Sequence, residues 1–126
     1  MVKNGKKVMM VEDDLFFIDL LGKKLRDGGY TLSFVNDGES AISLLDNNVP
    51  DIILLDILLP GIDGYEVAKK IKDNEKYKDI PIIFLTNFGS KENIEKGKAL
   101  GVKEFLIKST VTFDEIIEKI KKILGN

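Results

Sequence analysis

The chain has 126 residues, of which 44% are hydrophobic and 32% charged, so it is long enough to form one domain around a single core. Its formal net charge of −2 and its single arginine give no sign of nucleic-acid binding. The chain contains neither cysteine nor histidine, which excludes disulfides and thiolate chemistry and leaves oxygen ligands for a metal such as Mg²⁺, Mn²⁺ or Ca²⁺.

Five short apolar runs of strand length are spaced along the chain, and a helical pattern follows each of them. The third run has four consecutive apolar residues, which is typical of a strand buried on both faces. The runs that we predict to be strands are, in chain order, Lys7–Val11, Thr31–Val35, Ile52–Leu55, Ile80–Leu85 and Phe105–Ile107.

The helices between these runs have N-terminal signals. Asp14 is placed to cap the first helix, which extends to about Arg26 and stops at a pair of glycines. Glutamates stand three residues after Asp63 and Thr112, which is the spacing of a capping box, although aspartate replaces the usual serine or threonine in the first. The helices are predicted to begin near Asp14, Asn36, Asp63, Ser90 and Thr112.

This alternation predicts an α/β protein with the doubly wound (βα)₅, flavodoxin-like fold. Right-handed crossovers place helices on both faces of a five-stranded parallel sheet of order 2-1-3-4-5, with a ligand crevice expected between the first and third strands. No linker, repeat or low-complexity segment interrupts the pattern, so we expect residues 1–126 to form a single domain, without room for an output domain after the last helix.

Polar side chains stand at the C-terminal ends of the predicted strands. Glu12 and Asp13 follow the first strand, Asp56 the third, Thr86 the fourth and Lys108 the fifth. Because parallel strands point the same way, these side chains should meet in one cleft. Crowded carboxylates favour a hard cation such as Mg²⁺, while lysine and threonine can bind phosphate oxygens. The set predicts a site for phosphoryl transfer, in which an aspartate can be the nucleophile.

Four motifs, in this order, resemble the receiver domain of the bacterial two-component response regulator family, and the resemblance covers essentially the whole chain. It implies a phosphorylation-controlled signalling switch that catalyses only its own phosphorylation and dephosphorylation. The implied partners are a sensor histidine kinase or histidine phosphotransfer protein and a downstream effector, with no direct contact to nucleic acid or membrane. The motifs are Val11–Asp14, Leu55–Gly64, Leu85–Thr86 and Phe105–Lys108.

The resemblance also implies roles at the metal and phosphate positions. Asp56 accepts the phosphoryl group from a phosphohistidine and binds Mg²⁺ together with Asp13. Glu12 acts on the metal largely through water, and the backbone carbonyl of Leu58 is a further ligand. Lys108 bridges to Asp56 or its phosphate.

A second set of implied roles concerns the switch. Thr86 moves to bond a phosphoryl oxygen, and Phe105 is the aromatic whose inward or outward rotamer follows that movement. Core packing explains an aromatic at position 105 about as well. The face built from the fourth helix, fifth strand and fifth helix would then be recognised by the effector.

Four positions depart from the family pattern. Ser109 follows the lysine where proline is usual, often after a cis bond, so we expect either a trans, rearranged loop or a strained cis bond. Asn87 follows the threonine where a small residue is usual, and is expected to narrow access to the phosphorylation site. Leu58 and Phe88 are apolar at positions that flank the path of attacking water, which predicts slow self-dephosphorylation.

Three other functions fit parts of the sequence. An aspartyl-nucleophile phosphatase also uses aspartate and Mg²⁺, but generally needs a second acid where this chain has Leu58. A flavin-binding protein of the same fold needs a phosphate-binding loop after the first strand, where acids stand instead. A degenerate receiver that acts only as a protein-binding scaffold is left open by Ser109 and Asn87.

The N-terminus gives an expectation about location. Residues 1–7 are basic, but the apolar stretch that follows ends at Glu12 and is too short for a signal peptide. No apolar run approaches the length of a membrane span. We therefore expect a cytoplasmic protein.

Overall fold

The computed structural model describes residues 5–125, which form five strands and five helices in strict alternation. The strands are β1 (Lys7–Val11), β2 (Thr31–Val35), β3 (Ile52–Leu55), β4 (Ile82–Thr86) and β5 (Glu104–Ile107). The helices are α1 (Leu15–Asp27), α2 (Gly38–Leu45), α3 (Gly64–Lys72), α4 (Lys91–Ala99) and α5 (Phe113–Leu124). None of these helices is long and apolar enough to cross a membrane.

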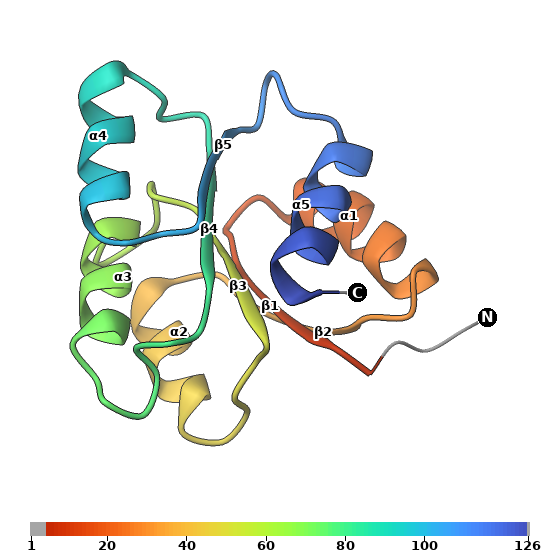
Figure 1. Ribbon diagram of the computed structural model, residues 1–126, viewed down its shortest axis with the longest axis horizontal. Coiled ribbons are helices and arrows are strands. Elements are labelled where there is room, and N and C mark those ends of the chain that lie inside the picture. Colours follow the sequence, from red (N-terminus) through yellow and green to blue (C-terminus); the bar gives the residue numbers. More distant parts are fainter. Residues whose placement is uncertain (1–4, 126) are drawn as a thin grey trace.

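The strands form one parallel sheet in the order β2-β1-β3-β4-β5, which confirms the predicted topology. Figure 1 shows α2, α3 and α4 on one face of this sheet and α1 and α5 on the other. The connection from β1 leads to β2 on one side of it, whereas the connection from β2 leads to β3 on the other side of β1. The C-terminal ends of β1 and β3 therefore border a crevice.

Two apolar clusters, one on each face, hold the layers together. Along β1, Met9 and Val11 belong to the cluster beneath α2 and α3, whereas Val8 and Met10 belong to the cluster beneath α1 and α5. All four residues of β3 are buried, since neighbouring strands and both layers of helices cover them. The central strands are thus rigidly placed, and so are the residues that directly follow them.

The element boundaries differ from the sequence prediction in small ways. The fourth strand begins at Ile82, later than predicted, because Pro81 has no N–H to donate to a ladder and the preceding residues form a turn. It ends at Thr86, one residue later than predicted. Asp37 caps α2, and its side chain accepts the Ser40 N–H at 2.7 Å. The capping box of Thr112 is present in full, whereas Asp63 caps α3 without the reciprocal bond.

Gly64 allows α3 to begin directly against the segment that follows β3. Its N–H donates to the Ile57 carbonyl at 2.8 Å. A Cβ at this position would lie 2.2 Å from the backbone oxygen of Asp56 and 2.7 Å from the Cα of Ile57. These are backbone atoms that cannot turn aside, so a side chain at position 64 would displace the carboxyl end of β3.

We expect Gly64→Ala to lower the free energy of unfolding by roughly 3 kcal/mol, since overpacking against backbone outweighs the better helix propensity of alanine. Urea unfolding followed by circular dichroism measures the change. Gly28→Ala is the matched control, because its added methyl would meet nothing closer than 3.4 Å. A Gly64→Ala protein as stable as the Gly28→Ala protein would contradict the close approach.

Candidate functional site

Three acidic side chains gather where β1 and β3 end. Val11 pairs with Leu55, so the residues that follow these two strands are neighbours, and the Asp56 N–H donates to the Val11 carbonyl at 3.0 Å. Carboxylate oxygens of Glu12, Asp13 and Asp56 lie within 4.8 Å of one another. The parallel register therefore brings Glu12 and Asp56 together, although they are far apart in the sequence.

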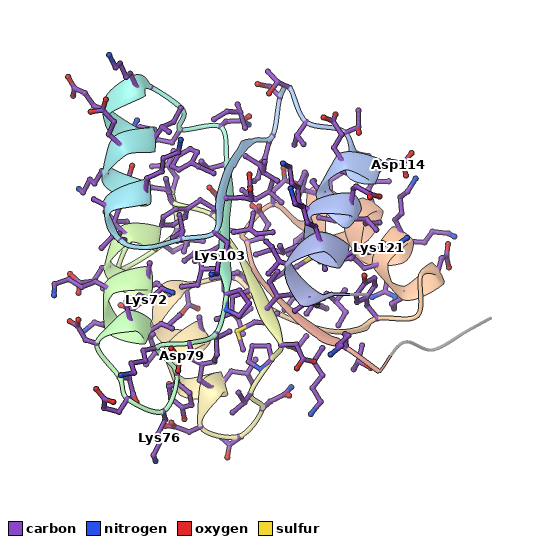
Figure 2. All side chains as sticks on the ribbon, in the orientation of Figure 1. Lys72, Lys76, Asp79, Lys103, Asp114 and Lys121 are labelled. Carbon is purple, nitrogen blue, oxygen red and sulfur yellow. The ribbon has the colours of Figure 1, made fainter. Side chains whose placement is uncertain are left out.

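The charged side chains labelled Lys72, Asp79 and Lys103 in Figure 2 lie at the other edge of the sheet, around the starts of β4 and β5. Burial lowers the pKa of Lys72, and the positive charge of Lys103 lowers it further. The acidic crevice is thus well separated from this lysine-rich edge.

Burial and mutual repulsion make the acidic cluster electrostatically unusual. Glu12 is 3% exposed and Asp56 is 7% exposed, whereas Asp13 faces solvent. Burial raises the pKa of Glu12 above its ordinary value, hydrogen bonds from Lys108 and the Asp14 N–H oppose the change, and the charge of Asp56 adds to it. Two buried carboxylates that repel each other need a cation nearby.

Lys108 supplies a positive charge between the two buried acids. Its ammonium forms an ion pair with Glu12 and donates to Oδ2 of Asp56 at 3.0 Å. Burial acts to lower the pKa of Lys108, but the bonds to Glu12 and Asp56 outweigh it and raise the pKa above its ordinary value. The lysine is therefore held in its charged form.

Phe17 of α1 also contacts this lysine, although it was not among the predicted site residues. The ammonium of Lys108 lies 4.6 Å from the centroid of the Phe17 ring, and that ring packs edge-on against Phe113 at 5.7 Å. A cation over an aromatic face is favourable when water is partly excluded. Leu21 and Leu25 are buried on one face of α1, and position 17 lies one turn earlier on that face, which was the available signal in the sequence.

Oδ1 of Asp56 and the carboxylate of the neighbouring Asp14 accept hydrogen bonds from nearby backbone N–H groups. Oδ1 of Asp56 accepts the N–H of Ile57 at 2.7 Å. The side chain of Asp14 accepts the N–H groups of Phe16 at 3.0 Å and Phe17 at 3.2 Å. Asp14 is therefore the cap of α1, as predicted, and it stands outside the acidic cluster.

Thr86 ends β4 beside the cluster and is 1% exposed. Its hydroxyl oxygen accepts the N–H of Phe88 at 3.1 Å, and no hydrogen bond joins it to Asp56 within residues 5–125. The threonine side chain is thus engaged with its own loop, while its hydroxyl proton stays available for a further acceptor.

Phe105 of β5 packs inward beneath α4. Its ring lies 5.6 Å from that of Phe84, and a Cβ on Gly97 of α4 would come within 2.7 Å of it. Phe84 in turn contacts the Tyr65 ring at 5.6 Å, and the Tyr65 hydroxyl donates to Asn93 of α4. The ring of Phe105 therefore occupies the space that the lack of a side chain on Gly97 provides.

The departures from the family pattern have defined positions. The peptide bond between Lys108 and Ser109 is trans, one of the two conformations that the sequence left open. The side chain of Asn87 accepts the N–H of Ser109 at 3.0 Å, a bond that sequence reasoning did not anticipate because it joins two loops. Leu58 and Phe88 are 59% and 40% exposed.

We expect Lys108→Met to lower the free energy of unfolding by roughly 3 kcal/mol in a metal-chelating buffer, because it leaves two buried carboxylates without their cation. Adding Glu12→Gln to this variant should restore part of the loss, since one of the repelling charges is removed. Urea titrations of the wild type, both single variants and the double variant form the cycle. A double variant no more stable than Lys108→Met would show that the ion pair has no such effect.

A family model of the response regulator receiver domain matches residues 8–121 of the chain. The polar-differentiation response regulator DivK of Brucella ovis is 35% identical over 121 residues, covering 96% of this chain and 98% of DivK. The protein ycf27 of Guillardia theta, named as a transcriptional regulator, is 35% identical over 107 residues, which are 85% of this chain. The alignment spans only 41% of ycf27, so that relative is much longer than the part it shares.

Solved structures agree with these relatives. A protein described as a response regulator from Chloroflexus aurantiacus superimposes with a TM-score of 0.90 at 31% identity, covering 98% of this chain and all of that one. The receiver domain of a sensor histidine kinase from Pseudomonas aeruginosa, which has a magnesium ion coordinated in its active-site cleft, gives a TM-score of 0.87 at 28% identity over 97% of this chain and 99% of its own. The chain belongs to the response regulator receiver family of two-component signalling systems.

Proposed function

We propose that Asp56 is the phosphoacceptor of this receiver domain and that it takes a phosphoryl group from a phosphohistidine on a histidine kinase or a histidine phosphotransfer protein. The observation that carries the proposal is the Lys108 ammonium 3.0 Å from Asp56, beside the carboxylates of Glu12 and Asp13. A cluster of acids beside one fixed ammonium group suits the binding of a phosphoryl group, which carries negative charge, together with a metal ion.

The residues present fit Mg²⁺. Asp13, Asp56 and Glu12 offer oxygen ligands within 4.8 Å of one another, and Glu12 would act largely through water. The backbone carbonyl of Leu58 would be a further ligand. When bound, the metal would neutralise charge that develops on the phosphoryl oxygens. The neighbour from Pseudomonas aeruginosa, with magnesium in its cleft, supports this assignment.

The transfer needs little chemistry from the protein. A carboxylate oxygen of Asp56 forms a bond to phosphorus as the phosphorus–nitrogen bond of the donor breaks, and the electron pair leaves with the histidine nitrogen. Lys108 would hold the carboxylate in place and then pair with the phosphoryl oxygens. Thr86 would donate its free hydroxyl proton to one of those oxygens.

Phosphorylation would change the surface around β5. Movement of Thr86 toward the phosphoryl group would vacate space beside β5, where Thr86 pairs with Ile107 and the ring of Phe105 lies against Gly97 of α4. The face of α4, β5 and α5 would then present a different shape to an effector. The chain would catalyse only its own phosphorylation and dephosphorylation. Residues 1–126 would act as one receiver domain, located in the cytoplasm.

Exposed apolar side chains are consistent with a protein as the phosphoryl donor. Leu15 and Phe16 lie at the start of α1, and Leu58 and Phe88 lie in the loops after β3 and β4. All four are exposed and belong to segments that follow the C-terminal ends of the strands, where Asp56 also lies. Apolar side chains gathered around a charged site favour docking of a macromolecule over capture of a small anion.

The proposal is tested with acetyl phosphate and with beryllofluoride, each with and without Mg²⁺, on the wild type and on Asp56→Asn. We expect a mass increase of one phosphoryl group with acetyl phosphate, and shifts in the amide spectrum around Thr86 and Phe105 with either reagent. Both should require Mg²⁺ and vanish in Asp56→Asn. An unchanged wild type would favour a protein-binding scaffold, and turnover of an external phosphate ester would favour a phosphatase.

We further expect phosphorylated Asp56 to be long-lived, because neither Leu58 nor Phe88 can orient an attacking water molecule. The variant Leu58→Asn with Phe88→Gln should lose its phosphoryl group roughly tenfold faster, which corresponds to about 1.4 kcal/mol in the barrier. Loss is followed by mass after the phosphodonor is removed. Leu20→Asn, an exposed leucine on α1, is the control, and equal lifetimes in all three proteins would refute the prediction.

A further inference from the structure

Asn87 and Ser109 each follow one of the residues proposed to bind the phosphoryl group, and they are joined to each other. Oδ1 of Asn87 accepts the N–H of Ser109 at 3.0 Å. We infer that Asn87 is a positioning residue, which uses this bond to hold the Lys108 backbone against the Thr86 backbone. Only the expected effect of Asn87 on phosphorylation rests on the proposed function of Asp56.

The bond prolongs the pairing of β4 with β5 beyond the end of both strands. Thr86 pairs with Ile107, and the next N–H, that of Lys108, donates to the Thr86 carbonyl at 2.9 Å. The Ser109 N–H, one residue further on, donates to the side-chain carbonyl of Asn87. A side-chain amide thus ties together two loops where the backbone ladder has stopped.

A second observation shows that the loop after β4 lies close to the end of β5. Gly89, two residues after Asn87, lies so near β5 that a Cβ there would come within 2.1 Å of the Ile107 side chain. The N–H of Gly89 donates to the Asn87 carbonyl at 3.1 Å, which fixes the turn that presents the Asn87 side chain. In the loop after β5, the N–H groups of Thr110 and Val111 both donate to the Ile107 carbonyl.

The bond depends on the identity of both residues. A proline at position 109 would have no N–H to donate, and alanine at position 87 would have no acceptor. The Lys108 side chain has four flexible methylenes, so its ammonium reaches Glu12 and Asp56 in one geometry only if its backbone is fixed. The Asn87–Ser109 bond fixes it one residue away, on the side of Thr86.

The first test measures the bond in the unphosphorylated protein. In Asn87→Ala the Ser109 amide should exchange with solvent about threefold or more faster, and the ¹⁵Nζ signal of Lys108 should broaden. Asn87→Asp keeps an acceptor and should restore slow exchange, and Ser109→Ala keeps the N–H and should behave as the wild type. Exchange at position 109 that is the same in the wild type and Asn87→Ala would overturn the inference.

The second test is a double-mutant cycle on the rate of phosphorylation by acetyl phosphate in saturating Mg²⁺. Asn87→Ala should slow the reaction about threefold when Ser109 is present, and should have no effect in a Ser109→Pro background, which lacks the donor. An equal loss in both backgrounds would show that Asn87 acts by some other route. If even the wild type is not phosphorylated, the proposed function fails, while the exchange test still decides whether the bond positions Lys108.

Discussion

The structure depends on one electrostatic arrangement, in which the Lys108 ammonium lies between the buried carboxylates of Glu12 and Asp56. Two such acids side by side would repel each other, and burial already raises the pKa of Glu12. The lysine offsets this repulsion, but only because β1, β3 and β5 end at the same edge of the sheet. The parallel sheet is thus what makes the charge cluster possible, and the crossover helices are what make the sheet parallel.

The helices are not equally anchored, and this difference separates the rigid part of the molecule from the part that can respond. Helix α5 buries Ile116 and Ile120 in the cluster it shares with α1. Helix α4, by contrast, has Gly97 as its one buried residue and is otherwise rich in lysine and glutamate. An element with so little buried apolar surface opens at low free energy. It is also the element that rests on Phe105, so the rearrangement proposed at Thr86 would meet little resistance there.

The fold was predictable because its signals are local and repeated. Each strand is a short apolar run, and each is followed by a helix with a recognisable cap, so the order of elements follows from the sequence alone. The co-location of Glu12, Asp13, Asp56 and Lys108 then follows from strand direction without any knowledge of side-chain contacts. The start of β4 was misplaced because a single proline decides it.

Contacts between loops could not be predicted from these local sequence patterns. The bond from Ser109 to Asn87 joins segments 22 residues apart, and no periodicity or cap signal marks either residue. The position of the Phe17 ring over Lys108 depends on how far α1 is rotated about its axis, which is set by packing against α5. Sequence patterns assign a residue to an element and a face, whereas the path of a loop depends on which donors and acceptors the folded chain leaves over.

The cluster itself argues against a role as a passive scaffold. Buried charges are a weak source of stability, and well-packed apolar residues in their place are often neutral or stabilising. A chain that needed only this fold to present a binding surface would gain nothing from Glu12 and Asp56 in a crevice that requires Lys108 to offset them. A flavin phosphate would be repelled by the acids that follow β1, and a phosphatase would lack a second acid at Leu58. The proposed site, which would accept one phosphoryl group with a divalent cation, would use every one of these charges.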